Sequence, residues 1–278
     1  MANITAADVN KLRQMTGTGM MDCKNALVEA EGDFEKAIDI LRKKGQKLAL
    51  KRADRDANQG IVVAKTTADK KFASVIMLNC ETDFVAKNKE FIDYANKILD
   101  LTIEAKPASL EALLALTIDG RTIADGVTDL TGKTGEKMQL SHYEFIEAPL
   151  AVAYNHFGNR LAAILGLNKA EVAGIDDVAK HVAMQIAAMA PVALDKDGVD
   201  AETIAREIEV GKDQARAEGK AEEMLEKIAM GKLNKFYKEN TLLNQEFIND
   251  SKMSVREYLQ KADKDLTVTT FKRLQLGA

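Results

Sequence analysis

The chain has 278 residues, and its 39 Lys and Arg against 43 Asp and Glu give a formal net charge of −4. This balance argues against a protein whose main role is to wrap a polyanion. Hydrophobic residues make up 46% and charged residues 29%, an ordinary globular composition that excludes a disordered chain. The length is sufficient for two modest domains with a real core.

The cysteine pattern and the chain start restrict the class of protein further. Cys23 and Cys80 lie far apart and have no neighbouring Cys or His, which predicts free thiols and argues against a disulfide scaffold or a zinc site. The first residues lack a basic segment followed by an apolar run, and the weakly polar stretch 181–194 is too short to span a bilayer. We therefore expect a cytoplasmic protein without membrane contact.

Three short helices are expected at the start of the chain. The first begins after the N-cap residue Thr5 and ends at the glycine-containing break 16–19, and the second covers about 20–30. Asp33 is the expected N-cap of the third helix, whose apolar residues recur at helical spacing: Phe34, Ala37, Ile38 and Leu41. A module of this size has a thin core, so it is better suited to docking than to catalysis.

A basic run follows these helices and completes the expected module, residues 1–54. Two interpretations are open: a phosphate or ribosome contact, or a solvated helix end and linker whose cations suit a helix C-terminus. The acidic net charge of the chain favours the second interpretation. The run contains a single acid, Asp54, and six basic residues: Lys43, Lys44, Lys47, Lys51, Arg52 and Arg55.

The segment 55–140 is expected to form the first part of an α/β core. Two strands, 60–64 and 72–80, flank a turn, and the apolar run within the second strand predicts that both of its faces are covered. A helix over 91–99 and a short helix over 109–116 follow. The glycine-rich stretch 119–135 gives no assignment.

The segment 141–278 repeats the order hairpin, helix, proline, which suggests an internal duplication. Its expected elements are strands 150–155 and 161–167, a helix over 176–190, a short helix over 254–262 and a last strand over 266–274. Between them, about 198–238, two narrow apolar stripes predict an inserted antiparallel helical hairpin that projects from the body. The fold class is therefore α+β, with a helical module, a two-subdomain core and a projecting hairpin.

The residues give little support for catalysis. The three histidines have no second ligand or nucleophile at useful spacing, and no Gly-rich phosphate loop is present. We expect a binding protein, not an enzyme, with no metal site and no cofactor. Two alternatives remain open: an RNA-associated protein that uses the basic run, and a small-molecule enzyme that uses Glu81 and Asp83 as an acid/base pair.

Two stretches stand out and carry a resemblance. Residues 12–27 read LRQMTGTGMMDCKNAL and residues 82–87 read TDFVAK. Together they resemble the elongation factor Ts family, and the resemblance extends over essentially the whole chain. It implies a ubiquitin-associated-like N-terminal module, a two-subdomain core and a coiled-coil hairpin. It also implies guanine nucleotide exchange on elongation factor Tu during translation elongation in protein biosynthesis.

The resemblance further implies which residues contact elongation factor Tu, in its nucleotide-free and GDP forms, without direct nucleic-acid contact. A tip is inserted near the Mg²⁺ and phosphate site of the GTPase, and it consists of Thr82, Asp83, Phe84 and Val85. The N-terminal module contributes Met20, Met21, Asp22 and Lys24. The second subdomain contributes His156 and Arg160. Homodimerisation through the hairpin varies in this family and is left open.

Overall fold

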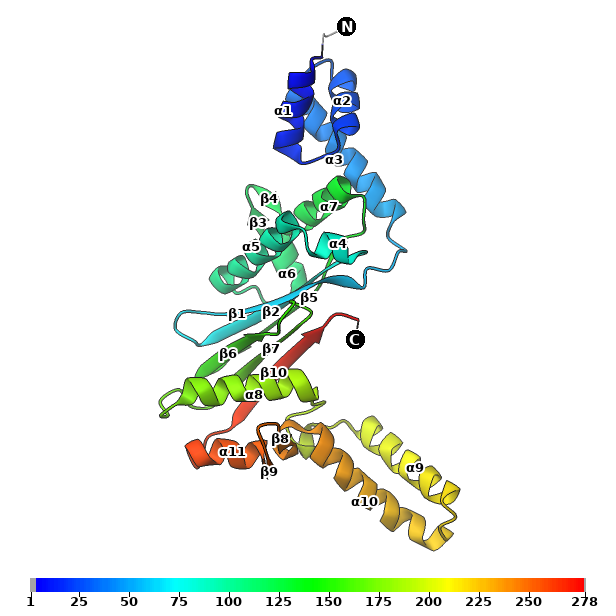
Figure 1. Ribbon diagram of the computed structural model, residues 1–278, viewed down its shortest axis with the longest axis vertical. Coiled ribbons are helices and arrows are strands. Elements are labelled where there is room, and N and C mark those ends of the chain that lie inside the picture. The colour runs from blue at the N-terminus through cyan, green and yellow to red at the C-terminus, as the bar shows by residue number, and fades with distance from the viewer. Residues whose placement is uncertain (1–3, 278) are drawn as a thin grey trace.

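The computed structural model describes residues 4–277 and shows an elongated molecule. A small helical module stands at one end, a body of two sheets with flanking helices lies in the middle, and a helical hairpin projects from the other end (Figure 1). The architecture confirms the α+β class expected from the sequence.

The three predicted helices of the N-terminal module are present: α1 (Ala6–Thr16), α2 (Met20–Glu29) and α3 (Phe34–Lys51). At the start of α1, the Asp8 amide donates to Thr5 Oγ1 at 3.2 Å and the Thr5 amide donates to Asp8 Oδ2 at 3.0 Å, a reciprocal cap. Helix α3 extends beyond its last apolar repeat and includes most of the basic run, because Lys and Leu are strong helix formers.

The first half of the body is a three-stranded antiparallel sheet covered by helices on one face. The sheet order is β1-β2-β5. Its strands are β1 (Gln59–Thr66), β2 (Phe72–Cys80) and β5 (Gln139–Glu147), and the intervening elements are α4 (Asp83–Ala86), α5 (Lys89–Ala105), α6 (Leu110–Ala115), β3 (Thr117–Ile118), β4 (Arg121–Thr122) and α7 (Ile123–Thr134).

Several elements of this half were not assigned from the sequence. The short strand β3 precedes the glycine-rich stretch, which forms β4 and α7. Helix α7 is capped by Thr122 and is followed by its C-cap Gly135, whose φ of 77° suits glycine. Strand β5 escaped detection because its pairing with β2 shifts near Ser141, which interrupts the alternation of apolar residues.

The second half repeats the plan of the first. A hairpin is followed by a helix, and a later strand then pairs with the second hairpin strand, giving the order β10-β7-β6. The elements are β6 (Leu150–Asn155), β7 (Leu161–Leu167), α8 (Ile175–Met189), η1 (Lys196–Gly198), η2 (Leu242–Asn244), β8 (Glu246–Phe247), β9 (Asp250–Ser254), α11 (Val255–Ala262) and β10 (Val268–Gln275).

The two sheets pack face to face, and helices cover the outer faces. Val62, Val75 and Met77 from the first sheet form one apolar cluster with Ala151 and Ile164 from the second. Every residue of β2 is buried, because helices cover one face and the second sheet covers the other. This confirms the expectation that both faces of the strand are covered.

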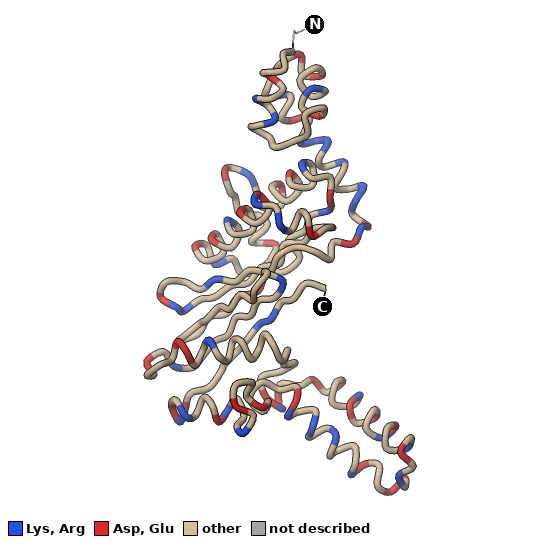
Figure 2. Tube along the Cα trace, viewed as in Figure 1, with Lys and Arg blue, Asp and Glu red and all other residues tan. Residues whose placement is uncertain are grey.

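The predicted antiparallel hairpin consists of α9 (Ala201–Ala217) and α10 (Glu222–Asn240). Its buried seam is narrow, and an added Cβ at Gly211 would lie 3.1 Å from the Ala229 Cα atom, so the helices cross closely. Figure 2 shows charges of both signs along the hairpin, which extends away from the body into solvent.

Candidate functional site

The residues 82–85 form an exposed tip at the end of β2. The strand ends at Cys80, and Thr82 is the N-cap of α4, with its hydroxyl 3.4 Å from the Val85 amide nitrogen. Phe84 is 84% exposed, whereas Val85 packs partly against the helix-covered core. The tip therefore has an anchored inner side and a phenyl ring in solvent.

Asp83 places a negative charge beside this ring. Lys87 Nζ donates to Asp83 Oδ2 at 2.6 Å, and this hydrogen bond, together with the charge of Lys87, lowers the pKa of Asp83. The carboxylate is ionised at neutral pH. Because the ion pair is exposed, water screens it and a partner can displace Lys87 at small cost.

The base of the tip is fixed by contacts from other elements. The Glu136 carboxylate accepts from the Thr82 amide at 3.0 Å and from Thr82 Oγ1 at 2.6 Å. Glu81 accepts from the Lys137 amide at 2.6 Å and from Arg52 Nη1 at 2.7 Å. Sequence reasoning missed Glu136, since nothing local marks a contact across so many residues.

The geometry does not support an acid/base pair of Glu81 and Asp83. The hydrogen bond from the Lys137 amide lowers the pKa of Glu81, with further lowering by Arg52. Lys87 lowers the pKa of Asp83. A general acid at neutral pH needs a raised pKa, so two carboxylates that are both kept ionised lack the contrast that such catalysis requires.

The N-terminal module presents two methionines to solvent. Met20 and Met21 begin α2 and are 51% and 63% exposed, while Cys23 on the next turn lies in the module core. Asp22 forms an ion pair with Lys44 of α3, and Lys24 is exposed. The two flexible thioether side chains therefore face solvent, whereas Cys23 packs inside the module.

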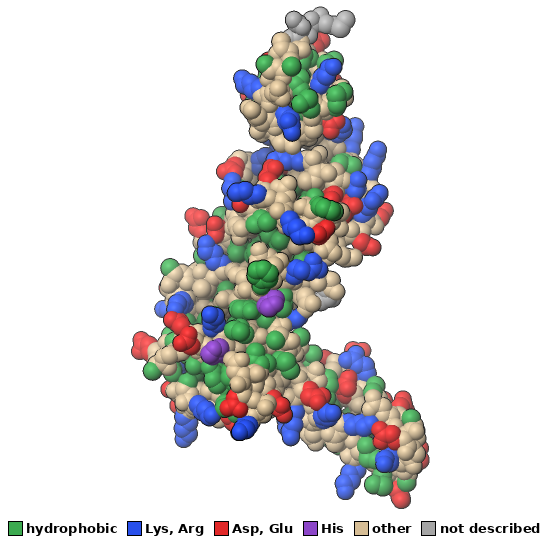
Figure 3. Space-filling view, viewed as in Figure 1, with side chains coloured by type: hydrophobic (Ala, Val, Ile, Leu, Met, Phe, Trp, Pro, Cys, Tyr) green, Lys and Arg blue, Asp and Glu red, His purple; other side chains and the backbone are tan. Residues whose placement is uncertain are grey.

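The β6–β7 turn contains the third group of predicted residues. His156 Nδ1 lies 3.1 Å from the Tyr154 hydroxyl, and Arg160 Nη1 donates to Gln59 Oε1 at 2.7 Å, which ties the turn to the first sheet. Phe157, at 97%, is the more prominent exposed apolar residue of this turn, and the sequence analysis did not select it. Figure 3 shows apolar side chains exposed on the body near two histidines.

Comparison with known proteins decides the family. The family model described as Elongation factor TS matches residues 81–278, including the tip. The chain belongs to the elongation factor Ts family. The elongation factor Ts of Christiangramia forsetii is 51% identical over 277 residues and covers 100% of both chains. Those of Amoebophilus asiaticus and Flavobacterium psychrophilum are each 50% identical, covering 99% and 100% of both chains respectively.

Membership of the elongation factor Ts family makes this chain a translation elongation factor and confirms the resemblance found in its motifs. Within residues 4–277, no group of three or more His, Cys, Asp or Glu side chains could hold a metal ion. None of the helices that the structure describes is long and apolar enough to cross a membrane.

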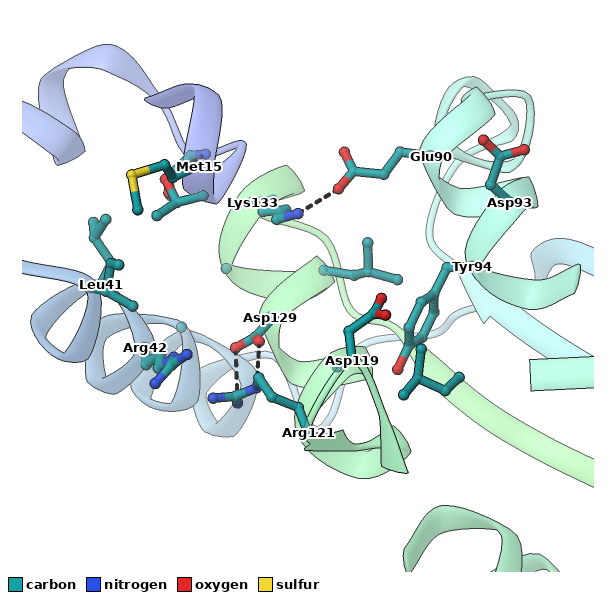
Figure 4. A pocket seen from close by; sticks show the side chains of 18 of the residues that line it. Met15, Leu41, Arg42, Glu90, Asp93, Tyr94, Asp119, Arg121, Asp129 and Lys133 are labelled. Atoms are coloured by element: carbon teal, nitrogen blue, oxygen red, sulfur yellow. Dashed lines mark hydrogen bonds and ion pairs between the residues drawn. The ribbon is translucent and has the colours of Figure 1, made fainter. Parts of the chain in front are cut away.

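A cleft of this family member lies between the N-terminal module and helices α5 and α7 (Figure 4). It has a volume of about 810 Å³, and Met15 and Leu41 contribute apolar walls from the module side. Lys133 pairs with Glu90, and other charges on the wall are paired in the same way. The cleft marks the junction between the N-terminal module and the first half of the body.

Proposed function

We propose that this chain is the guanine nucleotide exchange factor for elongation factor Tu and promotes GDP release by inserting its tip near the Mg²⁺ and phosphate site. The observation that carries the proposal is the exposed Asp83–Phe84 pair on an anchored turn in a member of the elongation factor Ts family. Two features of the tip support insertion: the exposed Phe84 can enter an apolar slot, and the base of the tip at Thr82 is fixed by hydrogen bonds.

The two tip side chains have different tasks in this mechanism. Phe84 enters an apolar slot between GTPase helices, and burial of a phenylalanine side chain contributes about 1.5–3 kcal/mol. Asp83 brings an anion next to a bound Mg²⁺ ion and the diphosphate, which disturbs the charge balance that holds the ion. Weaker Mg²⁺ coordination loosens the diphosphate, and GDP dissociates.

Two further surfaces hold the partner while the tip acts. On the N-terminal module, the exposed Met20 and Met21 pack on the GTPase domain, flanked by Asp22 and Lys24. On the second subdomain, the turn containing His156 and Arg160 contacts the third domain of elongation factor Tu. Contacts at separate places on an elongated molecule direct the tip to a single spot on the partner.

Thermodynamic linkage limits the mechanism. If the factor lowers the affinity of the GTPase for GDP, GDP lowers the affinity of the GTPase for the factor by the same ratio. The factor therefore binds both the nucleotide-free and the GDP forms, the former more tightly, and incoming nucleotide expels it. No covalent step and no cofactor are needed, so the chain acts by binding and not as an enzyme.

We also propose the structural units that serve this function. Residues 1–54 form a ubiquitin-associated-like module with a basic linker, 55–140 form one core subdomain, and 141–278 form the other, with the hairpin at about 198–238. The activity belongs to the cytoplasm, where translation elongation takes place. Sedimentation of the isolated protein distinguishes a monomer from a homodimer formed through the hairpin.

The proposal is tested by mixing the protein with cognate elongation factor Tu loaded with a fluorescent GDP and an excess of unlabelled nucleotide. We expect the rate of GDP release to rise with the concentration of the factor and then to saturate. A release rate that does not change at any concentration would contradict the exchange function.

A further inference from the structure

Helix α4 is too short to be stable by itself. It spans four residues, Asp83–Ala86, and a single helical turn fixes several backbone angles for very few hydrogen bonds. Its own N-cap contact is long, with 3.4 Å between Thr82 Oγ1 and the Val85 amide nitrogen. The conformation of the tip must therefore be imposed from outside α4.

Val85 and Ala86 pack partly against the core, and Glu136 supplies a polar contact from outside α4. This residue follows Gly135, which ends α7 in a left-handed conformation and directs the chain back toward the end of β2. Its two carboxylate oxygens accept separately from Thr82, one from the amide at 3.0 Å and the other from the hydroxyl at 2.6 Å. Hydrogen bonds to a carboxylate are the stronger kind, and two of them fix both position and orientation.

A reciprocal contact joins the residue before Thr82 to the residue after Glu136. Glu81 Oε1 accepts from the Lys137 amide at 2.6 Å, so each of the two neighbouring segments provides a carboxylate to the backbone of the other. Arg52 near the end of α3 adds a hydrogen bond to the same Glu81 oxygen at 2.7 Å. The Cys80 thiol also donates to the Thr82 carbonyl at 3.1 Å.

We propose that Glu136 is a positioning residue for nucleotide exchange: by binding the N-cap residue Thr82 through both carboxylate oxygens, it holds Asp83 and Phe84 in the orientation in which they enter the partner. The inference rests on the proposed function. Glu136 acts through Thr82 and not by contact with nucleotide or Mg²⁺. Without it, Phe84 samples many orientations and the partner must select the productive one.

The chain offers a matched control. At the start of α11, Glu257 Oε2 accepts from the Ser254 amide at 2.7 Å and from the Ser254 hydroxyl at 3.0 Å, the same pair of donors on an N-cap residue. Removing this carboxylate abolishes a similar cap at the start of α11, in the second half of the body. Glu257→Ala therefore reports the general effect of losing one N-cap carboxylate.

The experiment compares Glu136→Ala, Glu136→Gln and Glu257→Ala by exchange kinetics, thermal unfolding and amide hydrogen exchange. For Glu136→Ala we expect kcat of exchange to fall by about tenfold, the effect of losing hydrogen bonds to a charged group. KM should change little, because the other contact surfaces remain. In Glu136→Ala, the amides of Val85 and Ala86 should lose protection against hydrogen exchange. Glu257→Ala should keep the wild-type rate of nucleotide exchange.

Glu136→Gln keeps the side-chain volume and one acceptor oxygen, so its kcat should lie between those of wild type and Glu136→Ala. If the alanine variant does not fold, Glu136→Gln is the variant that tests the proposal. Wild-type kcat in both Glu136 variants, or an equal loss in Glu257→Ala, would overturn the proposal. If the wild-type protein does not accelerate nucleotide exchange, the proposed function fails. Unchanged protection of the Val85 and Ala86 amides in the Glu136 variants would separately refute the positioning of the tip by Glu136.

Discussion

Phe84 is 84% exposed on a turn whose base is held by hydrogen bonds that Thr82 donates to Glu136. A single exposed apolar side chain is common on protein surfaces. An exposed ring on a one-turn helix with an anchored base, beside an ionised Asp83, is more informative. Under the proposed function, this residue is a contact for the partner.

The methionine pair of α2 gives a prediction at the same scale. Met20→Ala with Met21→Ala should weaken binding to elongation factor Tu while the melting temperature changes little, because exposed substitutions usually change stability by about 0.5 kcal/mol or less. Binding is measured by titration calorimetry and stability by thermal unfolding. Val28→Ala, 58% exposed on the same helix, is the control. A large fall in melting temperature would instead place the methionines in the module core.

Cys80 should be chemically inert in the folded protein. Burial, together with the charge of the nearby Glu136 carboxylate, raises the pKa of its thiol to about 12. Since the thiolate is the reactive form, almost none is present at neutral pH. A colorimetric thiol reagent should therefore react with the native protein only at the rate of unfolding. Fast reaction of Cys80 without denaturant would contradict the described packing.

At residue scale, sequence motifs located the exposed side chains but not their supports. Phe84 and Met20 were selected because their neighbours match a family pattern. Nothing local marks Glu136, because its partner Thr82 is distant in sequence. The exposure of Phe157 likewise depends on the fold around it. Local sequence patterns indicate helix and strand periods. Contacts between residues distant in sequence depend on the tertiary fold, which these patterns do not give.

Among the elements, the crossing of α3 and α7 decides where the N-terminal module stands. Gly45 and Gly132 meet there: a Cβ added to Gly132 would lie 3.1 Å from the Gly45 Cα atom, and one added to Gly45 would lie 3.3 Å from the Gly132 Cα atom. Small residues at this point let the two backbones approach closely. The long third helix thus connects the module to the core through a close backbone contact.

This crossing predicts an unusual response to alanine. In an open helix position, Gly→Ala is favourable by about 1 kcal/mol, and Gly231 of α10 is such a position, with open space around its Cα atom. Gly231→Ala should therefore raise the melting temperature. Gly132→Ala should lower it, because the added methyl group pushes the helices apart. Equal increases in thermal unfolding of the two variants would show that the crossing is not tight.

The elements themselves were largely predictable. The helices α1, α2 and α5, the hairpin strands and the helical hairpin follow from apolar period and capping residues. Strand β5 did not, since its bulge near Ser141 breaks the alternation and its two faces contact different layers, with Tyr143 toward the helices and Ile146 toward the second sheet. Helix α7 was hidden by its glycines, one of which is needed for the close crossing.

In the whole molecule, a polar link between the N-terminal module and the base of the tip contains a titrating group, Glu81. The hydrogen bond from the Lys137 amide, followed by the contact with Arg52, lowers the pKa of Glu81 below its usual 4.5. A lowered carboxyl pKa contributes stability above the unfolded-state pKa, and this contribution is lost as the pH falls through the folded-state pKa.

Glu81→Gln should therefore be less stable than the wild type near neutral pH, and the difference should shrink on acidification. The measurement is the difference in melting temperature between the two proteins from about pH 6 to pH 3, which brackets the usual carboxyl range. A difference that grows as the pH falls would contradict the ionised state of Glu81 in the link between the module and the tip.

The elongated shape spreads the three proposed contact surfaces along the molecule: the methionines of α2, the tip at α4 and the β6–β7 turn (Figure 1). Two sheets packed face to face connect the tip to the turn. Under the proposed function, a partner that touches all three surfaces is oriented while the tip reaches its nucleotide site.

The most direct test of this account is GDP release from elongation factor Tu at saturating factor, with Phe84→Ala compared with Val192→Ala, which is 60% exposed on another surface. The account predicts that Phe84→Ala folds with an unchanged melting temperature and loses most of the acceleration, while Val192→Ala keeps it. Full acceleration by a folded Phe84→Ala protein would contradict the central role of the tip.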